Sequence, residues 1–165
     1  MGALRSPSRW SPAPAEAQEI QDDLRGRELV RSSFQRIEPE AGVDRSVTRV
    51  CVRAAACVYR FPRHEPLEGA LAERPLEFSY VPGLLALREQ PELLAAIAKL
   101  ASKPEVFLVD GHGLAHPRRF GLAAHLGVLL DRPAIGCGKS IVVGEVVAAA
   151  LRSGAGGRAH ARIDR

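Results

Sequence analysis

An acid, two glycines, two histidines and two arginines fall within the segment VDGHGLAHPRR, residues 109–119. The apolar run Val106–Val109 ends directly before Asp110, which is therefore expected at the tip of a buried strand. A carboxylate there can cap a helix or form a turn. It also suits Mg²⁺, which takes one or two protein oxygens and keeps several of its waters. The metal interpretation needs a second acid, and the candidates are Asp44 and Glu89.

The two histidines of this segment do not indicate a zinc site. His112 and His116 have the i, i+4 spacing that zinc ligands adopt on a helix. Gly113 and Pro117 argue against a helix there, and no third soft ligand is near. Gly111 and Gly113 instead allow positive φ angles and a close approach of the backbone to a ligand. A plain tight turn would need the same glycines, so both explanations stay open.

The basic residues that follow are candidates for binding phosphate. Arg118 and Arg119 begin a helix expected over residues 118–130, where two positive charges oppose the helix dipole. A bound anion would relieve this repulsion. We therefore interpret His116 and the two arginines as phosphate contacts, with a solvated pair of surface charges as the alternative.

The segment GCGKS, residues 136–140, is similar to part of a phosphate-binding loop. The complete motif requires a glycine where this chain has Pro133, so that interpretation fails. Lys139 nevertheless follows an expected strand and should lie near Asp110. It could stabilise negative charge that develops on a phosphate there; the alternative is an exposed surface lysine.

Helical and alternating patterns predict the elements that position these residues. Helices are expected over residues 13–30 and 118–130, and two further helical pieces are expected to meet near Pro91. A short first strand should end at Asp44, and one strand or a hairpin is expected over 47–61. Further strands are expected over 67–78, 106–109 and 134–136. The order strand, helix, strand from residue 106 to residue 136 predicts a parallel crossover. Chemistry collects at the carboxyl ends of parallel strands, which is where Asp110 is expected.

The composition bounds the class of protein. The chain has 165 residues, of which 46% are hydrophobic and 25% charged, and we expect one globular domain of a cytoplasmic protein without signal peptide or membrane span. Lys and Arg exceed Asp and Glu by 23 − 19 = 4, which is compatible with a polyanionic partner. Cys51, Cys57 and Cys137 lack CxxC spacing, so we expect small buried side chains rather than disulfides or zinc ligands.

Several of these motifs, in this order, resemble the deoxyinosine-specific endonuclease V family. The resemblance is carried by GVD at 42–44, YVPGLLALRE at 80–89, LVDGHGLAHPRRFGLAAHLGVLLDRPAIG at 108–136 and the GKS that follows, and weaker similarity extends it over residues 10–140. The resemblance implies an α/β, ribonuclease-H-like fold: a mixed sheet flanked by helices, with acids clustered across neighbouring strands.

The resemblance also implies a chemistry. Family members hydrolyse the second phosphodiester bond 3′ to a deaminated purine such as deoxyinosine, with Mg²⁺ or Mn²⁺, and leave 3′-hydroxyl and 5′-phosphate ends. The partner would be DNA with deaminated bases, with inosine-containing RNA as an open alternative, and the protein would be a monomer without membrane attachment. Extracting a base from the stack costs on the order of a few kcal/mol, least where pairing is already weak.

Site residues can be assigned from the same resemblance. Asp44 and Asp110 would hold the metal, and Glu89 and Lys139 would complete the catalytic set. The remaining assignments are Tyr80, Pro82, His116 and Arg118 as DNA contacts, and Gly83, Leu85, Gly111 and Gly113 as the pocket for the lesion base. In the family the tyrosine belongs to a wedge that fills the gap left by the displaced base; without the resemblance, a buried turn aromatic would be the simpler interpretation.

The chain departs from the family pattern in several places. Ser79 stands where the wedge usually begins with proline, and Cys137 and Gly138 replace Val-Ala. Arg45 follows Asp44 where the family has an apolar or aromatic strand. After Ser140 the Ala-, Gly- and Arg-rich sequence lacks the family's further strands and its later metal-binding histidine or acid. We therefore expect a disordered terminus over residues 1–12, a family domain over 13–141 that is incomplete at its C-terminus, and an atypical tail over 142–165.

Three hypotheses follow from the sequence. The first is a metal-dependent DNA repair endonuclease, favoured by the presence of all three acids. The second is a catalytically impaired member that only binds nucleic acid, favoured by the atypical tail. The third is a generic parallel α/β domain with an unrelated ligand, which predicts that the three acids lie apart.

Overall fold

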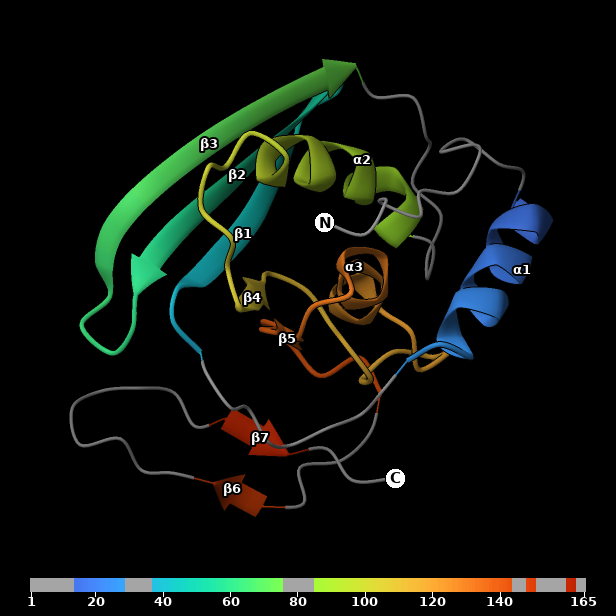
Figure 1. Cartoon of the computed structure of the whole chain (residues 1–165). Coiled ribbons are helices and arrows are strands. Elements are labelled where there is room, and N and C mark those ends of the chain that lie inside the picture. Colours follow the sequence, from blue (N-terminus) through green and yellow to red (C-terminus); the bar gives the residue numbers. More distant parts are fainter. Residues whose placement is uncertain (1–13, 29–36, 76–84, 144–147, 151–159, 163–165) are drawn as a thin grey trace.

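A computed structural model describes residues 14–28, 37–75, 85–143, 148–150 and 160–162 of the chain. The elements are α1 (Pro14–Arg25), β1 (Glu40–Val47), β2 (Cys51–Arg60), β3 (Glu65–Pro75), α2 (Leu85–Ile97), β4 (Val106–Val109), α3 (Leu122–Leu130), β5 (Ala134–Gly136), β6 (Ala148–Ala150) and β7 (His160–Arg162). The first five strands form a mixed sheet in the order β3-β2-β1-β4-β5, and β6 pairs with β7 separately. In Figure 1 the three helices lie on one side of the five-stranded sheet.

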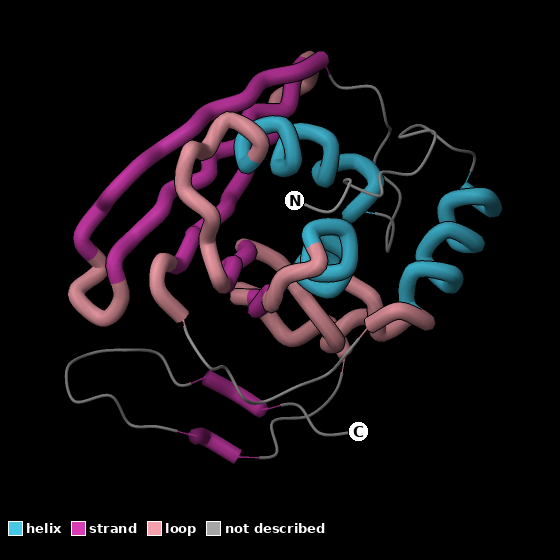
Figure 2. The backbone as a smooth tube through the Cα atoms, in the orientation of Figure 1, coloured by secondary structure: helices cyan, strands magenta, loops and turns pink. Residues whose placement is uncertain are grey.

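The long antiparallel part of the sheet arises from two successive hairpins. β1 pairs with β2 from Glu40↔Tyr59 to Val47↔Val52, and β2 pairs in turn with β3. The Thr48 hydroxyl closes the first turn by accepting a hydrogen bond from the Cys51 amide at 3.0 Å. These strands are long and curved, whereas β4 and β5 are short (Figure 2). Both short strands run parallel to β1, so the carboxyl ends of β1, β4 and β5 share one edge.

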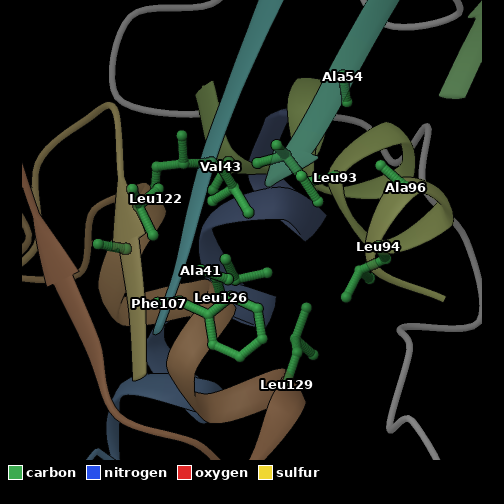
Figure 3. Packing of buried hydrophobic residues seen from close by; sticks show 14 of the residues in the cluster. Ala41, Val43, Ala54, Leu93, Leu94, Ala96, Phe107, Leu122, Leu126 and Leu129 are labelled. Carbon is green, nitrogen blue, oxygen red and sulfur yellow. The ribbon is translucent and has the colours of Figure 1, made fainter. Parts of the chain in front are cut away.

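The hydrophobic core lies between the sheet and the helices α2 and α3. Every second residue of β2 is buried from Val52 to Val58, as expected for a strand with one face on a core. Leu93 of α2 and Leu126 of α3 meet Val43 and Phe107 from the strands (Figure 3). Full burial of each large apolar side chain contributes about 1.5–3 kcal/mol. This packing holds β1 and β4 in place, and with them the residues at their ends.

The opposite face of the sheet carries no helix among the described elements, although it is also apolar. Strand register places Gly69, Cys57, Gly42, Leu108 and Ile135 in one row across all five strands. The exposed large hydrophobic residues on strands include Leu71, which is 71% exposed, and Ile135 at 41%. Nor does any helix in the described ranges have the length and hydrophobicity to cross a membrane.

The structure confirms the strands expected at 106–109 and 134–136. Of the two alternatives for residues 47–61, it shows one strand, β2, which a turn at 48–50 joins to β1. The first strand runs on past Asp44 to Val47, because its second half pairs with β2. The third strand, expected over 67–78, begins at Glu65; residues beyond Pro75 lie outside the described ranges. The first helix ends at Arg25 rather than Val30 within those ranges.

Two predicted helix boundaries are wrong. Pro91 does not divide the segment into two pieces but lies inside the single helix α2. Residues on both sides of it, such as Ala86 and Leu93, are buried, and this packing offsets a proline penalty of about 3 kcal/mol. The helix expected from Arg118 begins at Leu122, because the Gly121 and Ala123 amides donate to the carbonyls of Gly113 and His112.

The prediction of three buried cysteines is also wrong. Cys51 and Cys57 are half-buried and Cys137 is exposed, although all three are free thiols. Cys57 lies on the open face of the sheet, which no described helix covers. Burial and the nearby Asp110 carboxylate raise the pKa of the Cys137 thiol, so the thiolate is disfavoured at neutral pH.

Candidate active site

Two carboxylates lie side by side where the pairing of β1 with β4 ends. The parallel register sets Val43 opposite Val109, and the Asp110 amide donates to the Val43 carbonyl at 3.1 Å. The next residues, Asp44 and Asp110, are therefore neighbours across the sheet. Sequence pattern placed both acids at strand ends, but the pairing of these two strands is what brings the carboxylates together.

The electrostatic surroundings of Asp110 favour its ionised form. Its side chain is 21% exposed, and this burial by itself raises the carboxyl pKa. A hydrogen bond from Lys139, together with the charges of Lys139 and Arg45, outweighs the burial and holds the pKa of Asp110 below its ordinary value. A carboxylate that stays charged at neutral pH is what an oxygen ligand for a divalent cation requires.

Lys139 reaches this pair from the segment after β5. Its Nζ donates to Asp110 Oδ2 at 2.7 Å, and the same carboxylate raises the Lys139 pKa, so the ammonium form is favoured. The Ser140 carbonyl lies 2.7 Å from Nε2 of His112, which ties this segment to the loop after β4. The ammonium is 79% exposed, so it is available to solvent and to a ligand.

Glu89 of α2 is linked to the two aspartates through its contact with Arg45. Alternation along β1 directs Asp44 to the open face and Arg45 toward α2, where its Nε contacts Oε2 of Glu89. One Nη of Arg45 lies 4.0 Å from an oxygen of Asp44 and 4.0 Å from an oxygen of Asp110. The guanidinium thus stands among all three acids, and the described residues contain no group of three ligating side chains arranged to hold a metal ion.

Arg45 is the site residue to which the sequence assigned no role. It could have been found from the strand pattern, because a charged residue that alternates onto the covered face of a buried strand needs a partner there. Glu89, only 2% exposed, is that partner on α2. Two neighbouring carboxylates nevertheless fit a hydrated divalent cation, since Mg²⁺ commonly takes one or two carboxylates and keeps water in its other positions.

The loop between β4 and α3 is packed tightly against the end of β5. Gly111 has a φ of +152°, a conformation that favours glycine, and a Cβ there would come within 3.1 Å of Leu122. A Cβ on Gly136 would lie 2.6 Å from the Gly113 amide nitrogen and 2.7 Å from the Gly111 carbonyl oxygen. The backbone of the loop is therefore held in one position, and Gly136 is a residue whose contribution the sequence did not reveal.

The candidate phosphate contacts lie farther along the same loop. The Arg118 side chain is half-buried and donates to the side-chain oxygen of Gln21 in α1 at 2.8 Å. Arg25 of α1 also donates to the Arg118 carbonyl, at 3.3 Å. Because α3 begins at Leu122, the argument that Arg118 and Arg119 oppose its dipole does not hold. His116 is half-buried, and its Nδ1 accepts from the Arg118 amide at 3.3 Å.

Some predicted site residues cannot be placed. Tyr80, Pro82 and Gly83 lie outside the described residues. Leu85 is the first residue of α2, but the position of its side chain is not described. The wedge and half of the expected base pocket therefore stay predictions.

A hollow of about 330 Å³ adjoins the carboxylates on the open face. Asp44 and Asp110 line one part of it, and Cys57, Tyr59 and Leu108 are among the residues that line the rest. The two acids therefore face a space that a ligand can enter.

The known proteins whose sequences match this chain are endonucleases V. The sequence profile of the Endonuclease V family matches residues 20–159. The chain belongs to the endonuclease V family. An Endonuclease V of Roseiflexus sp. (strain RS-1) is 47% identical over 135 residues, which cover 82% of this chain and 61% of that protein. The family match begins later than the expected residue 10 and extends beyond Ser140.

Solved structures of the endonuclease V family confirm the fold class. The Endonuclease V of Streptomyces avermitilis superposes with a TM-score of 0.77 at 42% identity, covering 83% of this chain and 62% of the other. The Endonuclease V of Ciona intestinalis, in complex with a 24mer DNA containing an inosine, gives a TM-score of 0.68 at 32% identity, with 78% and 58% covered. The chain thus spans about three fifths of the length of these relatives. The mixed sheet flanked by helices is ribonuclease-H-like, and the family is metal-dependent.

Proposed function

We propose that this chain is a DNA repair endonuclease that cleaves the second phosphodiester bond 3′ to a deaminated purine, leaving 3′-hydroxyl and 5′-phosphate ends. The observation that carries the proposal is the pair Asp44 and Asp110, which lie next to each other where the pairing of β1 with β4 ends, with Lys139 donating to Asp110. Family membership and the inosine-containing DNA bound by the Ciona relative support the same substrate.

Asp44 and Asp110 are the residues that would hold Mg²⁺ or Mn²⁺. The bound ion would polarise the phosphate and lower the pKa of a water molecule. Asp110 contributes by staying ionised, for the reasons given above. Asp44 faces the hollow on the open side of the sheet, where the phosphate backbone can approach.

Lys139 is positioned to stabilise charge on the scissile phosphate. Its ammonium is exposed apart from the bond to Asp110, so it can turn from that carboxylate to a phosphate oxygen. A fixed positive charge at the position where negative charge develops stabilises the transition state. The expected loss on removal of one such donor is on the order of a hundredfold in rate.

The substrate would be held by the loop after β4 and by the segment before α2. His116 and Arg118 are the proposed DNA contacts on the loop, and Gly111 and Gly113 provide the backbone of the proposed base pocket, together with Gly83 and Leu85. The support for the pocket is the packing of Gly136 against this loop, which presets its backbone. Tyr80 and Pro82 are the proposed wedge. We propose a monomer acting on DNA, with inosine-containing RNA as the second substrate to test.

The competing function is nucleic-acid binding without cleavage. One observation favours it: the Arg45 guanidinium pairs with Glu89 inside the acidic cluster. Under this alternative the loop still binds the deaminated site, but the phosphodiester bond stays intact.

A nicking assay with a 5′-labelled duplex containing one deoxyinosine distinguishes the two functions. The chain should produce one product, cut at the second bond 3′ to the lesion, in Mg²⁺ and none in EDTA. Asp110→Ala should lose at least a hundredfold in rate, whereas Asp22→Ala, which changes an exposed side chain of α1, should keep the parent rate. Binding of the duplex in a mobility-shift assay without any nick would support the alternative.

A further inference from the structure

We propose that Arg45 is an internal counter-cation of the acidic cluster, which a divalent ion must displace in order to bind. This inference rests on the proposed metal site at Asp44 and Asp110. It adds that the chain carries its own competitor for that site, and that Arg45 sets how much metal the site requires.

The position of the guanidinium is the first argument. It is in contact with Glu89 and lies 4.0 Å from carboxylate oxygens of both Asp44 and Asp110. Two positive groups cannot both occupy the space among three carboxylates without repelling each other, and this repulsion is strong where water is largely excluded. The Arg45 side chain is only 19% exposed, so solvent screens it poorly.

The burial of Glu89 is the second argument. A carboxylate that is 2% exposed needs positive charge or hydrogen bonds nearby, and Arg45 is one source of both. When a divalent ion joins Asp44 and Asp110, the ion supplies charge from the open face and displaces the Arg45 guanidinium from these two carboxylates, whether or not Arg45 keeps its contact with Glu89. Metal affinity therefore depends on the residue at position 45.

The third argument is the backbone. Asp44 and Arg45 are consecutive in β1, and alternation sends them to opposite faces of the sheet. The Arg45 side chain nevertheless comes within 4.0 Å of Asp110, which directly follows the end of β4. A shorter or uncharged residue at this position would leave the metal pair without its competitor.

Calorimetric titration with Mn²⁺ tests the inference without any measurement of cleavage. Arg45→Met, which keeps the length of the stem without the charge, should tighten Mn²⁺ binding about tenfold, whereas Arg45→Lys should keep the parent affinity. In EDTA, Arg45→Met should also melt at a lower temperature than the parent, and saturating Mn²⁺ should restore most of the difference.

The outcomes separate this inference from the proposed function. Asp110→Asn should abolish Mn²⁺ binding in every background; if it does not, the proposed metal site and the inference both fail. If Asp110→Asn abolishes binding but Arg45→Met leaves the affinity unchanged or weaker, the metal site stands and the inference is overturned. Should Arg45→Met not fold, Arg45→Gln carries the same test, because it keeps a hydrogen-bond donor toward Glu89 and removes the charge.

Discussion

Three helices lie on one side of the five-stranded sheet, whereas the other face has no helix over it in the described part of the chain. On the covered face, Val43, Val58 and Val109 are fully buried. On the open face, residues of similar character, such as Leu71 and Ile135, are exposed. The strands are thus apolar on both faces, as in sheets that are covered on both sides. Apolar character in a strand indicates that a face can be covered, and only the fold shows which face is.

The proposed active site draws on both faces. Asp44 faces the open side and its hollow, while the next residue, Arg45, faces α2 and Glu89. The open face therefore gives a ligand access to Asp44, and packing on the covered face holds Arg45 and Glu89 in place. Substitutions on the covered face should therefore lower the free energy of unfolding, whereas substitutions on the open face should change it little.

The largest effect should come from the centre of the covered face. Leu126 of α3 is fully buried within the core cluster, so Leu126→Ala should remove about 2–5 kcal/mol from the free energy of unfolding. Urea denaturation followed by circular dichroism measures this value. A loss smaller than that of an open-face variant such as Leu71→Ala would contradict the contrast between the faces.

A pH-dependent loss of stability should come from His125, which is buried in α3 against Phe120, with ring centroids 5.3 Å apart. Burial lowers the pKa of His125 from 6.5 to about 4, so the unfolded chain binds the proton more readily than the folded one. Its contribution is complete above pH 6.5 and is lost as the pH falls from 6.5 through 4, by up to about 3 kcal/mol.

Urea denaturation of the parent and of His125→Leu at several pH values measures the pH-dependent contribution of His125 to the free energy of unfolding. The leucine variant has no proton to bind, so its stability should fall less between pH 6.5 and pH 4. Parallel curves for the two proteins would show that His125 does not carry the dependence.

A smaller effect is expected at the junction of β5 with the loop. Gly136→Ala places a Cβ against the backbone at Gly111 and Gly113, and it should cost about 1–3 kcal/mol through overpacking. Gly113→Ala is the matched control, because its Cβ would meet nothing nearer than 3.9 Å. Equal melting temperatures for the two variants would show that the loop is not held by this contact.

The smallest effect is expected on the open face of the edge strand β3. Leu71→Lys replaces an exposed apolar side chain and should change the free energy of unfolding by no more than about 0.5 kcal/mol. Urea denaturation again provides the measurement. A loss of several kcal/mol would mean that another part of the polypeptide covers this face in solution.

Much of the site could be predicted because it depends on local pattern. The apolar run before Asp110 and the short strand before Lys139 place both residues at one edge of the sheet, and the structure joins them at 2.7 Å. Helix boundaries were less predictable. Pro91 is tolerated inside α2 because residues on both sides of it are packed, and α3 begins later than expected because backbone amides at its start donate to the loop after β4. The packing of α2 and the hydrogen bonds at the start of α3 both involve residues that are not neighbours in the sequence.

The sequence alone determined the short strands β4 and β5, the family and the three acids proposed for the site, because strand periodicity and motif spacing are properties of consecutive residues. The tertiary structure decided that Asp44 and Asp110 are neighbours, since this follows from the parallel pairing of β1 with β4. It also decided that Glu89 meets Arg45, because the covered face of β1 packs against α2. Which charges face each other depends on the packing of distant segments, and no local pattern contains that information.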